Sequence, residues 1–123
     1  MLAKSLTSSD AGERESALYA LRQIGPKAGA AVRPLYQKMQ ADDSFDSKAA
    51  AWALARIAPN NAQISVAVVR KLARGLTDIH EMVRLESAAA LGDMGASAKA
   101  AQAVLEKTAN DDSSEAVRST AAE

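Results

Sequence analysis

The chain has 123 residues, which is long enough for one domain with a real core and too short to expect two. Hydrophobic residues make up 48% and aromatic residues only 3%, which favours close packing of small-residue helices over a β-sandwich or barrel. The 15 basic and 15 acidic residues cancel and there is no cysteine, so net charge indicates neither nucleic acid nor membrane, and disulfides, thiolate zinc sites and cysteine nucleophiles are excluded.

Residues 1–7 are expected to form the end of a helix. They lack the apolar segment of a signal peptide. No apolar run approaches the roughly 20 residues needed to cross a bilayer. We therefore expect a soluble protein that does not associate with membranes, with the cytoplasm favoured as its location.

Periodic apolar residues then predict three pairs of helices and the beginning of a fourth pair after 110–114. The first helices are expected at 11–24, 46–57 and 78–95, and the second helices at 30–40, 63–76 and 98–109. Asp10 and Asp78 can cap helices, and Gly25 and Gly95 can end them. The predicted buried positions are Ala31, Val32, Leu35, Met39, Ile64, Val68, Val69, Leu72, Leu76, Val83, Ser87, Ala88, Ala90, Leu91, Met94, Ala101, Leu105 and Ala109.

An internal repeat underlies these pairs. Residues of the same type recur 70 positions apart (21 + 70 = 91 for leucine, 25 + 70 = 95 for glycine), and half of this offset is about 35 residues per helix pair. Further pairs at this offset are Thr7 and Thr77, Arg14 and Arg84, Leu35 and Leu105, and Asp42 and Asp112. The predicted units are a half-repeat 1–7, repeats 8–41, 42–76 and 77–110, and a partial repeat 111–123, which together form a single domain and a fragment of a longer chain.

The third copy carries the clearest motif, in which Asp78 is followed six residues later by Arg84 and then by Ala-Leu-Gly-x-Met-Gly ending at Gly95. Related pairs are Asp42 with Lys48 and Asp112 with Arg118, and Ser8 stands in the aspartate position before Arg14. This motif resembles the HEAT-like repeats, in particular the short variety of phycobiliprotein lyases. The resemblance implies an all-α, right-handed α-solenoid of three full repeats with terminal half-repeats.

Aspartates gather at the predicted turns: Asp42, Asp43, Asp78, Asp111 and Asp112. Read chemically, they are candidate carboxylate pairs for acid–base work or Ca²⁺. Read structurally, they cap the following helix, and the basic residue six positions on bonds the aspartate of the neighbouring repeat, which produces a ladder. We favour the structural interpretation, because no EF-hand, phosphate-binding loop or nucleophile elbow is present.

His80 and Glu81 form the sole His-Glu pair. HEAT-like hydroxylases hold two irons with several such pairs, whereas one histidine cannot complete that ligand set. We therefore expect a solvated loop or helix start here, and predict no catalytic residue, metal or cofactor.

Tyr19 and Trp52 each precede by two residues the leucine of their Ala-Leu motif. At that position they are expected to form a small convex docking patch or, alternatively, to cover the seam between stacked helices.

The second helices carry a row of basic and polar residues opposite their buried stripes. The predicted partner-binding residues are Lys4, Arg33, Gln37, Arg70, Arg74 and Lys107. In HEAT-like solenoids the second helices line the concave side, so the resemblance implies a basic groove. Alternatively, basic residues merely collect at helix C-termini, where the helix dipole favours them.

The sequence therefore indicates a non-enzymatic scaffold that binds a protein or peptide, acidic in character, on its concave face. One alternative is the scaffold part of a phycobilin-lyase-like or other enzyme assembly. Another is nucleic-acid binding through the same basic row, although that row lacks aromatic residues for stacking. Self-association through the terminal repeats is a further expectation.

Overall fold

The structure, a computed structural model, describes residues 2–122, and in this range every regular element is helical and no strand occurs. The predicted all-α class is confirmed. The chain divides into two compact units, residues 1–58 and 59–123. No helix between residues 2 and 122 is long and apolar enough to traverse a lipid bilayer.

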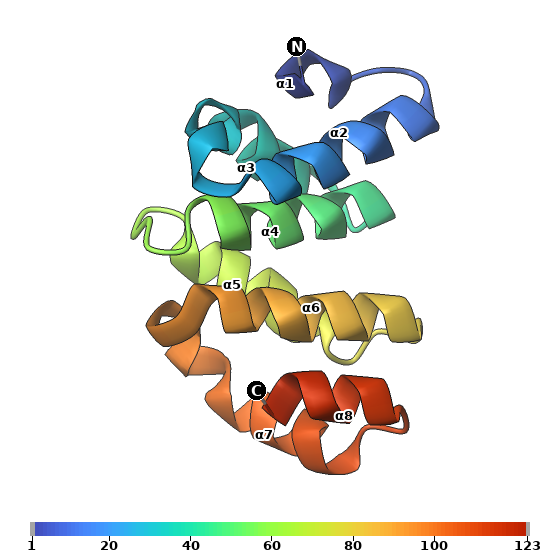
Figure 1. Cartoon of the computed structure of the whole chain (residues 1–123), viewed down its shortest axis with the longest axis vertical. Helices are drawn as coiled ribbons and strands as arrows, with labels where there is room; N and C mark the ends of the chain where they lie inside the picture. The colour runs from blue at the N-terminus through green and yellow to red at the C-terminus, as the bar shows by residue number, and fades with distance from the viewer. Residues whose placement is uncertain (1, 123) are drawn as a thin grey trace. The chain divides into compact units, whose positions relative to one another are not determined.

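The first unit contains α1 (Leu2–Ser5), α2 (Ala11–Ile24), the 3₁₀ segment η1 (Gly25–Ala31), α3 (Val32–Ala41) and α4 (Phe45–Ile57). Helix α4 packs against both α2 and α3, and α1 lies on α2 (Figure 1). The prediction for α2 agrees at both ends. Helix α3 begins two residues later than the predicted residue 30, because η1 occupies the link.

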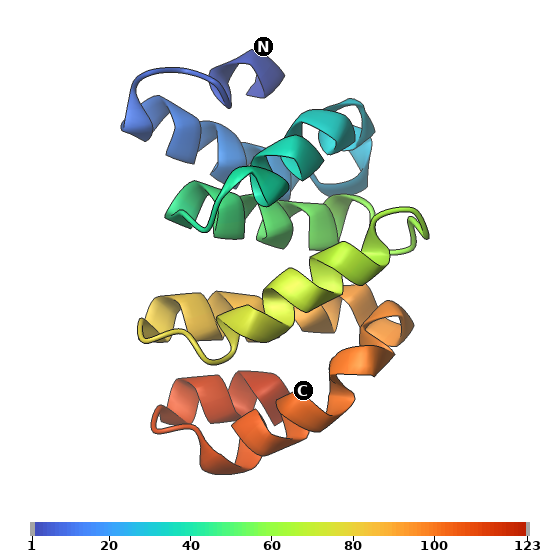
Figure 2. The ribbon, with the colours of Figure 1, turned by 180° about the vertical axis from the view of Figure 1, so that it is seen from behind.

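The second unit contains α5 (Ser65–Gly75), α6 (Glu81–Met94), η2 (Gly95–Ala101), α7 (Gln102–Asp111) and α8 (Glu115–Ala122). Helix α6 contacts α5 and α8, and α7 also contacts α8. Seen from behind, α5 and α7 cross in front of α6 and α8 (Figure 2). The face formed by α5 and α7 is therefore distinct from the face formed by α6 and α8.

The two units contain corresponding elements whose bounds differ by 70 residues. Helix α2 and η1 correspond in this way to α6 and η2, and α3 corresponds to α7 (32 + 70 = 102 and 41 + 70 = 111). Helices α2 and α6 both end at a glycine with positive φ, 72° at Gly25 and 54° at Gly95. This conformation is accessible to glycine at little cost, so the chain can leave the α-helix and enter the 3₁₀ segment at that point.

The predicted buried stripes are largely confirmed. All six positions predicted for α6 are buried, as are the five from Ile64 to Leu76. In contrast, Val32, Leu105 and Ala109 remain partly exposed. On α7 the buried residue is Thr108, whose hydroxyl donates to the carbonyl of Val104 at 2.9 Å and so satisfies its polar atom inside the helix.

The crossing of α5 and α6 depends on Gly75. A β-carbon added at Gly75 would lie 2.0 Å from Oγ and 2.8 Å from Cβ of Ser87. Both residues are buried. Two helices can approach this closely only where one of them has no side chain, so the glycine sets the distance between them.

Helix capping differs in part from the prediction. Asp10 is the N-cap of α2 and accepts a hydrogen bond from the amide of Gly12. The prediction for Asp78 is wrong, because His80 occupies the N-cap position of α6 and Asp78 Oδ1 accepts from the amide of His80. Asp42 and Asp112 behave in the same way toward the amides of Ser44 and Ser114. These aspartates shape the turn, while the hydroxyls of Ser44 and Ser114 accept from the helix amides.

Candidate functional site

The basic side chains of this protein fall into two groups, one paired within its unit and one facing solvent. In the first unit, Arg14 Nε lies 2.6 Å from Oδ2 of Asp46 and its Nη1 donates to the carbonyl of Ser8 at 2.8 Å. The guanidinium thus links the turn before α2 to the first turn of α4. Its five donors and planar shape suit this bridging role.

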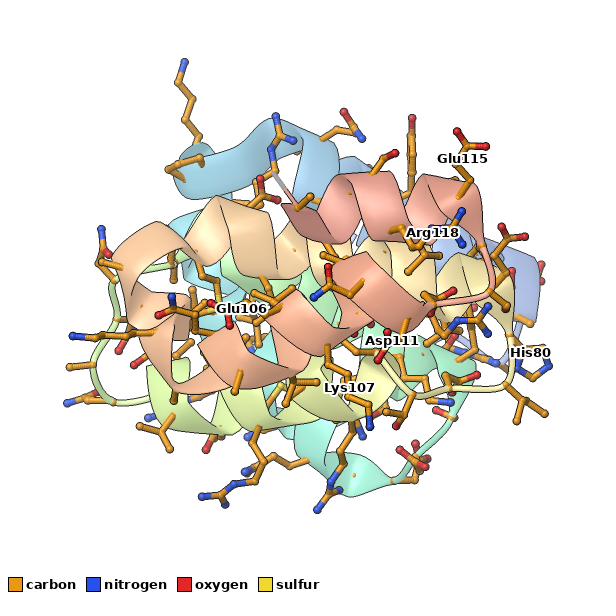
Figure 3. The ribbon with its side chains drawn as sticks, turned by 90° about the horizontal axis from the view of Figure 1, so that it is seen from below. His80, Glu106, Lys107, Asp111, Glu115 and Arg118 are labelled. Carbon is orange, nitrogen blue, oxygen red and sulfur yellow. The ribbon has the colours of Figure 1, made fainter. Side chains whose placement is uncertain are left out.

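The second unit repeats the arrangement. Arg84 Nε lies 2.9 Å from Oδ2 of Asp112, and its Nη1 donates to the carbonyl of Asp78 at 3.0 Å. Arg118 donates in turn to the carbonyl of Asp112 at 2.6 Å. Figure 3 labels Arg118 on α8 and Asp111, the last residue of α7. These arginines therefore hold helix starts together.

The predicted ladder is correct for Arg84 with Asp112 but wrong for Asp42. Arg14 pairs with Asp46 instead, because Asp46 lies in the first turn of α4 while the side chain of Asp42 turns toward the amide of Ser44. The carbonyl of Asp42 receives the hydroxyl of Ser47, which also donates to the carbonyl of Met39. A buried serine thus fulfils the role that arginine has at the other turns.

The predicted partner-binding residues form the second group. In the first unit they lie on α1 and α3, and in the second unit on α5 and α7. All six are exposed: Lys4, Arg33, Gln37, Arg70, Arg74 and Lys107. Within residues 2–122 no side chain forms an ion pair or hydrogen bond with any of these six side chains. The charges of the five cations among them are therefore available to an external ligand.

The positions of these cations along their helices bear on the helix-dipole explanation. Arg74 lies in the last turn of α5, where a cation is stabilised by the dipole. Arg33, however, is the second residue of α3, and Arg70 lies in the middle of α5. Helix dipoles disfavour the first of these positions and are indifferent to the second, so they do not account for the placement of Arg33 and Arg70.

Lys107 lies on the same side of the second unit as α5. Figure 3 shows it on the edge of α7 away from α8, whose Glu115 and Arg118 are labelled. Glu106 is the acidic residue next to it and is hydrogen-bonded through Oε1 to Gln102 Nε2 at 3.2 Å. The acidic neighbour is thus engaged along its own helix.

The expected patch of Tyr19 and Trp52 is wrong for Trp52. Tyr19 is 68% exposed, but Trp52 is only 5% exposed. The ring of Phe45 meets Trp52 edge-on at 5.6 Å between centroids, and the guanidinium of Arg22 on α2 lies 5.9 Å from the indole. The indole therefore covers the α2–α4 contact, which is the alternative that the sequence left open.

The His80 imidazole is exposed, and its Nδ1 lies 3.0 Å from Oδ1 of Asp78 (Figure 3). Across residues 2–122 no three histidine, aspartate or glutamate side chains are grouped so that they could hold a metal ion. The side chains of Asp42, Asp78 and Asp112 accept hydrogen bonds from backbone amides at the turns, and Asp112 also pairs with Arg84.

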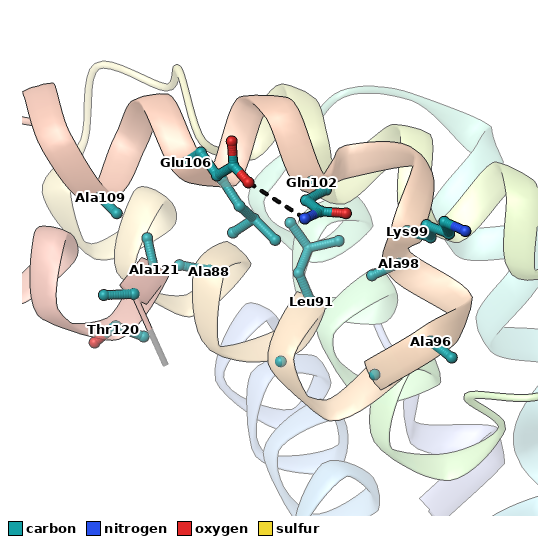
Figure 4. A pocket seen from close by; sticks show the side chains of 14 residues that line it. Ala88, Leu91, Ala96, Ala98, Lys99, Gln102, Glu106, Ala109, Thr120 and Ala121 are labelled. Atoms are coloured by element: carbon teal, nitrogen blue, oxygen red, sulfur yellow. Dashed lines mark hydrogen bonds between the residues drawn. The ribbon is translucent and has the colours of Figure 1, made fainter.

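An open hollow is present in each unit. That of the second unit, about 540 Å³, is lined mainly by small and apolar residues of α6, η2, α7 and α8, with the Gln102–Glu106 hydrogen bond at its rim (Figure 4). That of the first unit, about 490 Å³, is polar and includes Arg14, Asp46, Asp42, Lys38 and Ser44. Because Arg14 and Asp46 neutralise each other there, this hollow presents no strong field to a charged ligand.

No protein-family model matches the sequence, and comparison with curated proteins finds no match either.

Proposed function

We propose that the protein is a non-catalytic interaction module, a HEAT-like α-solenoid whose second helices bind an acidic protein segment. The observation that carries the proposal is that each unit exposes cations on its second helices, Arg33 on α3 in the first unit and Arg70, Arg74 and Lys107 on α5 and α7 in the second, none of which has a partner among the described side chains. Arg14, Arg84 and Arg118, in contrast, are held by carboxylates and carbonyls. An exposed cation without such a contact can pair with an external carboxylate at little structural cost.

Two features support the HEAT-like assignment. The first is the common 70-residue offset in the bounds of the helices of the two units. The second is the arginine that donates, in three places, to the carbonyl six residues before it, which gives the Asp-x5-Arg motif a structural reason. The lyase-assembly alternative makes the same use of the fold, with the chemistry supplied by another subunit. It is distinguished by pigment binding, seen as a change in visible absorbance.

Nucleic-acid binding through the same row is the remaining alternative. Duplex phosphates attract any basic surface. The association constant falls by roughly 0.9 log units per contacted phosphate for each log unit of increase in salt concentration. The row contains no aromatic side chain on which bases could stack. A carboxylate-rich partner fits the few, spaced cations better than a continuous phosphate backbone does.

The test is binding of a labelled polyglutamate peptide, with duplex and single-stranded oligonucleotides in parallel, at low and moderate salt. The informative variant is Arg70→Glu with Arg74→Glu. Its matched control is Lys27→Glu with Lys99→Glu, which changes net charge equally at exposed positions in η1 and η2. Loss of peptide binding in the first variant alone supports the proposal. Equal loss in both variants, or a preference for oligonucleotides, contradicts it.

A further inference from the structure

Helix α5 carries one apolar and two basic side chains on a single exposed ridge. Val66, Arg70 and Arg74 follow each other at intervals of four residues, and all three are exposed, Val66 by 67%. Residues four apart lie on neighbouring turns of the same helix face. Four residues at 1.5 Å each place successive members of the ridge about 6 Å apart along the helix axis.

The ridge has one sign of charge. Helix α5 contains Arg70, Lys71 and Arg74 and no acidic residue. No described side chain pairs with either arginine of the ridge. The potential along the ridge is therefore positive over two turns and is not cancelled within the helix.

The spacing of the ridge matches that of an extended peptide. In an extended chain, side chains on one face recur every second residue, or about 6.6 Å. Two carboxylates at alternate positions would thus lie opposite Arg70 and Arg74, and an apolar side chain two residues further would lie opposite Val66. A contiguous acidic run would place every other carboxylate on the wrong side.

A helical partner fits this face less well. Helices bind in grooves through an apolar stripe of several side chains. Val66 is the one large apolar residue of α5 that the described chain exposes, and the exposed fraction of Val104 on α7 is smaller. The affinity must then come mainly from charge, which an extended segment can deliver with one carboxylate per turn of α5.

We propose that the Val66–Arg70–Arg74 ridge binds an extended protein segment in which acidic residues alternate with small polar ones beside a single apolar residue. This inference rests on the proposed function and specifies its partner. The binding segment is defined by its spacing, so a partner with the same charge but a different order binds less tightly. The ridge therefore recognises side chains at every second residue of its partner.

The experiment compares three synthetic peptides of equal length and net charge by fluorescence anisotropy at ionic strength on the order of 0.05 M, where screening is weak. The first alternates glutamate and serine symmetrically around a central leucine, so that it can be read in either direction. The second has the same residues with the glutamates contiguous. In the third peptide, alanine replaces serine and the glutamates are four residues apart, which favours a helix.

The alternating peptide is expected to bind most tightly, and Arg70→Glu with Arg74→Glu to weaken it roughly tenfold or more, because two attractions are lost and two repulsions gained. An alternating lysine peptide is expected to recover binding to that variant. Val66→Ser is expected to weaken the leucine peptide by a few-fold and leave unchanged a peptide with serine in place of leucine.

The outcomes separate the two proposals. If wild-type protein binds the alternating and contiguous peptides equally, but the double reversal of charge (Arg70→Glu with Arg74→Glu) abolishes binding of both peptides, the spacing inference is wrong. The acidic-partner function then stands. Tighter binding of the helical peptide also overturns the spacing inference. If the double reversal changes none of the affinities while far-ultraviolet circular dichroism shows the variant folded, both proposals fail.

Discussion

Arg84 and Asp112 form an ion pair across 28 residues of sequence, with Nε 2.9 Å from Oδ2 and side chains that are only 14% and 7% exposed. The pair joins the first turns of α6 to the turn before α8. The same guanidinium also donates to the carbonyl of Asp78. Because the ion pair is largely shielded from bulk water, its removal destabilises the fold more than removal of an exposed pair does.

Replacing Arg84 with methionine, which keeps much of the side-chain volume, removes the charge-assisted bonds and leaves Asp112 largely buried without its counter-ion. We expect the free energy of unfolding to fall by about 1–3 kcal/mol. Urea denaturation followed by circular dichroism measures the change. Arg70→Met is the control and should lie within about 0.5 kcal/mol of wild type, because no described side chain forms a hydrogen bond or ion pair with that exposed guanidinium. Similar losses in both variants would refute the division between paired and available arginines.

Gly75→Ala tests the close crossing of α5 and α6. The added methyl would overlap Oγ of Ser87 at 2.0 Å, so the helices must separate. We expect the free energy of unfolding to fall by about 1–3 kcal/mol, although alanine ordinarily stabilises a helix relative to glycine. Adding Ser87→Gly should recover part of the loss in a double-mutant cycle, since both of the closest atoms belong to that side chain. A stabilised Gly75→Ala variant would show that the crossing is looser than this contact implies.

Two glycines of the second unit should respond to alanine with opposite signs. At Gly95, φ is 54°, and alanine there should cost about 1–3 kcal/mol because of backbone strain. Gly92 lies inside α6, is exposed, and a β-carbon there meets nothing within 4 Å. Gly92→Ala should therefore stabilise by about 0.5–1 kcal/mol. Thermal unfolding of the two single variants is sufficient, and effects of the same sign would contradict the assignment of the helix end.

The sequence was informative wherever one dominant force decides the structure. Apolar periodicity and the glycine stops located α2 at both ends, and every core position of α6, because burial and backbone freedom leave few alternatives there. It was not informative about which of several neighbouring polar groups makes a given bond. Asp42 and Asp46 both lie close to the turn before α4, and the sequence does not show which of them pairs with Arg14. In the structure the partner is Asp46. For a related reason the sequence left two alternatives open for Trp52, since its position relative to leucine matches that of Tyr19 but Phe45 packs against Trp52 alone.

Trp52 and Tyr19 give the last prediction, because similar positions in the motif have opposite burial. Trp52→Ala removes a large buried ring that contacts Phe45 and lies beside Arg22, and should cost about 3–5 kcal/mol. Tyr19→Ser removes a ring that is 68% exposed and should change stability by no more than about 0.5 kcal/mol. Trp52 is the sole tryptophan, so its fluorescence reports this environment without interference. Emission shifted to the blue and weakly quenched by iodide is expected in the folded protein, with a red shift on unfolding. Efficient quenching in the folded protein would show that Trp52 is exposed and would support a docking patch formed by Tyr19 and Trp52.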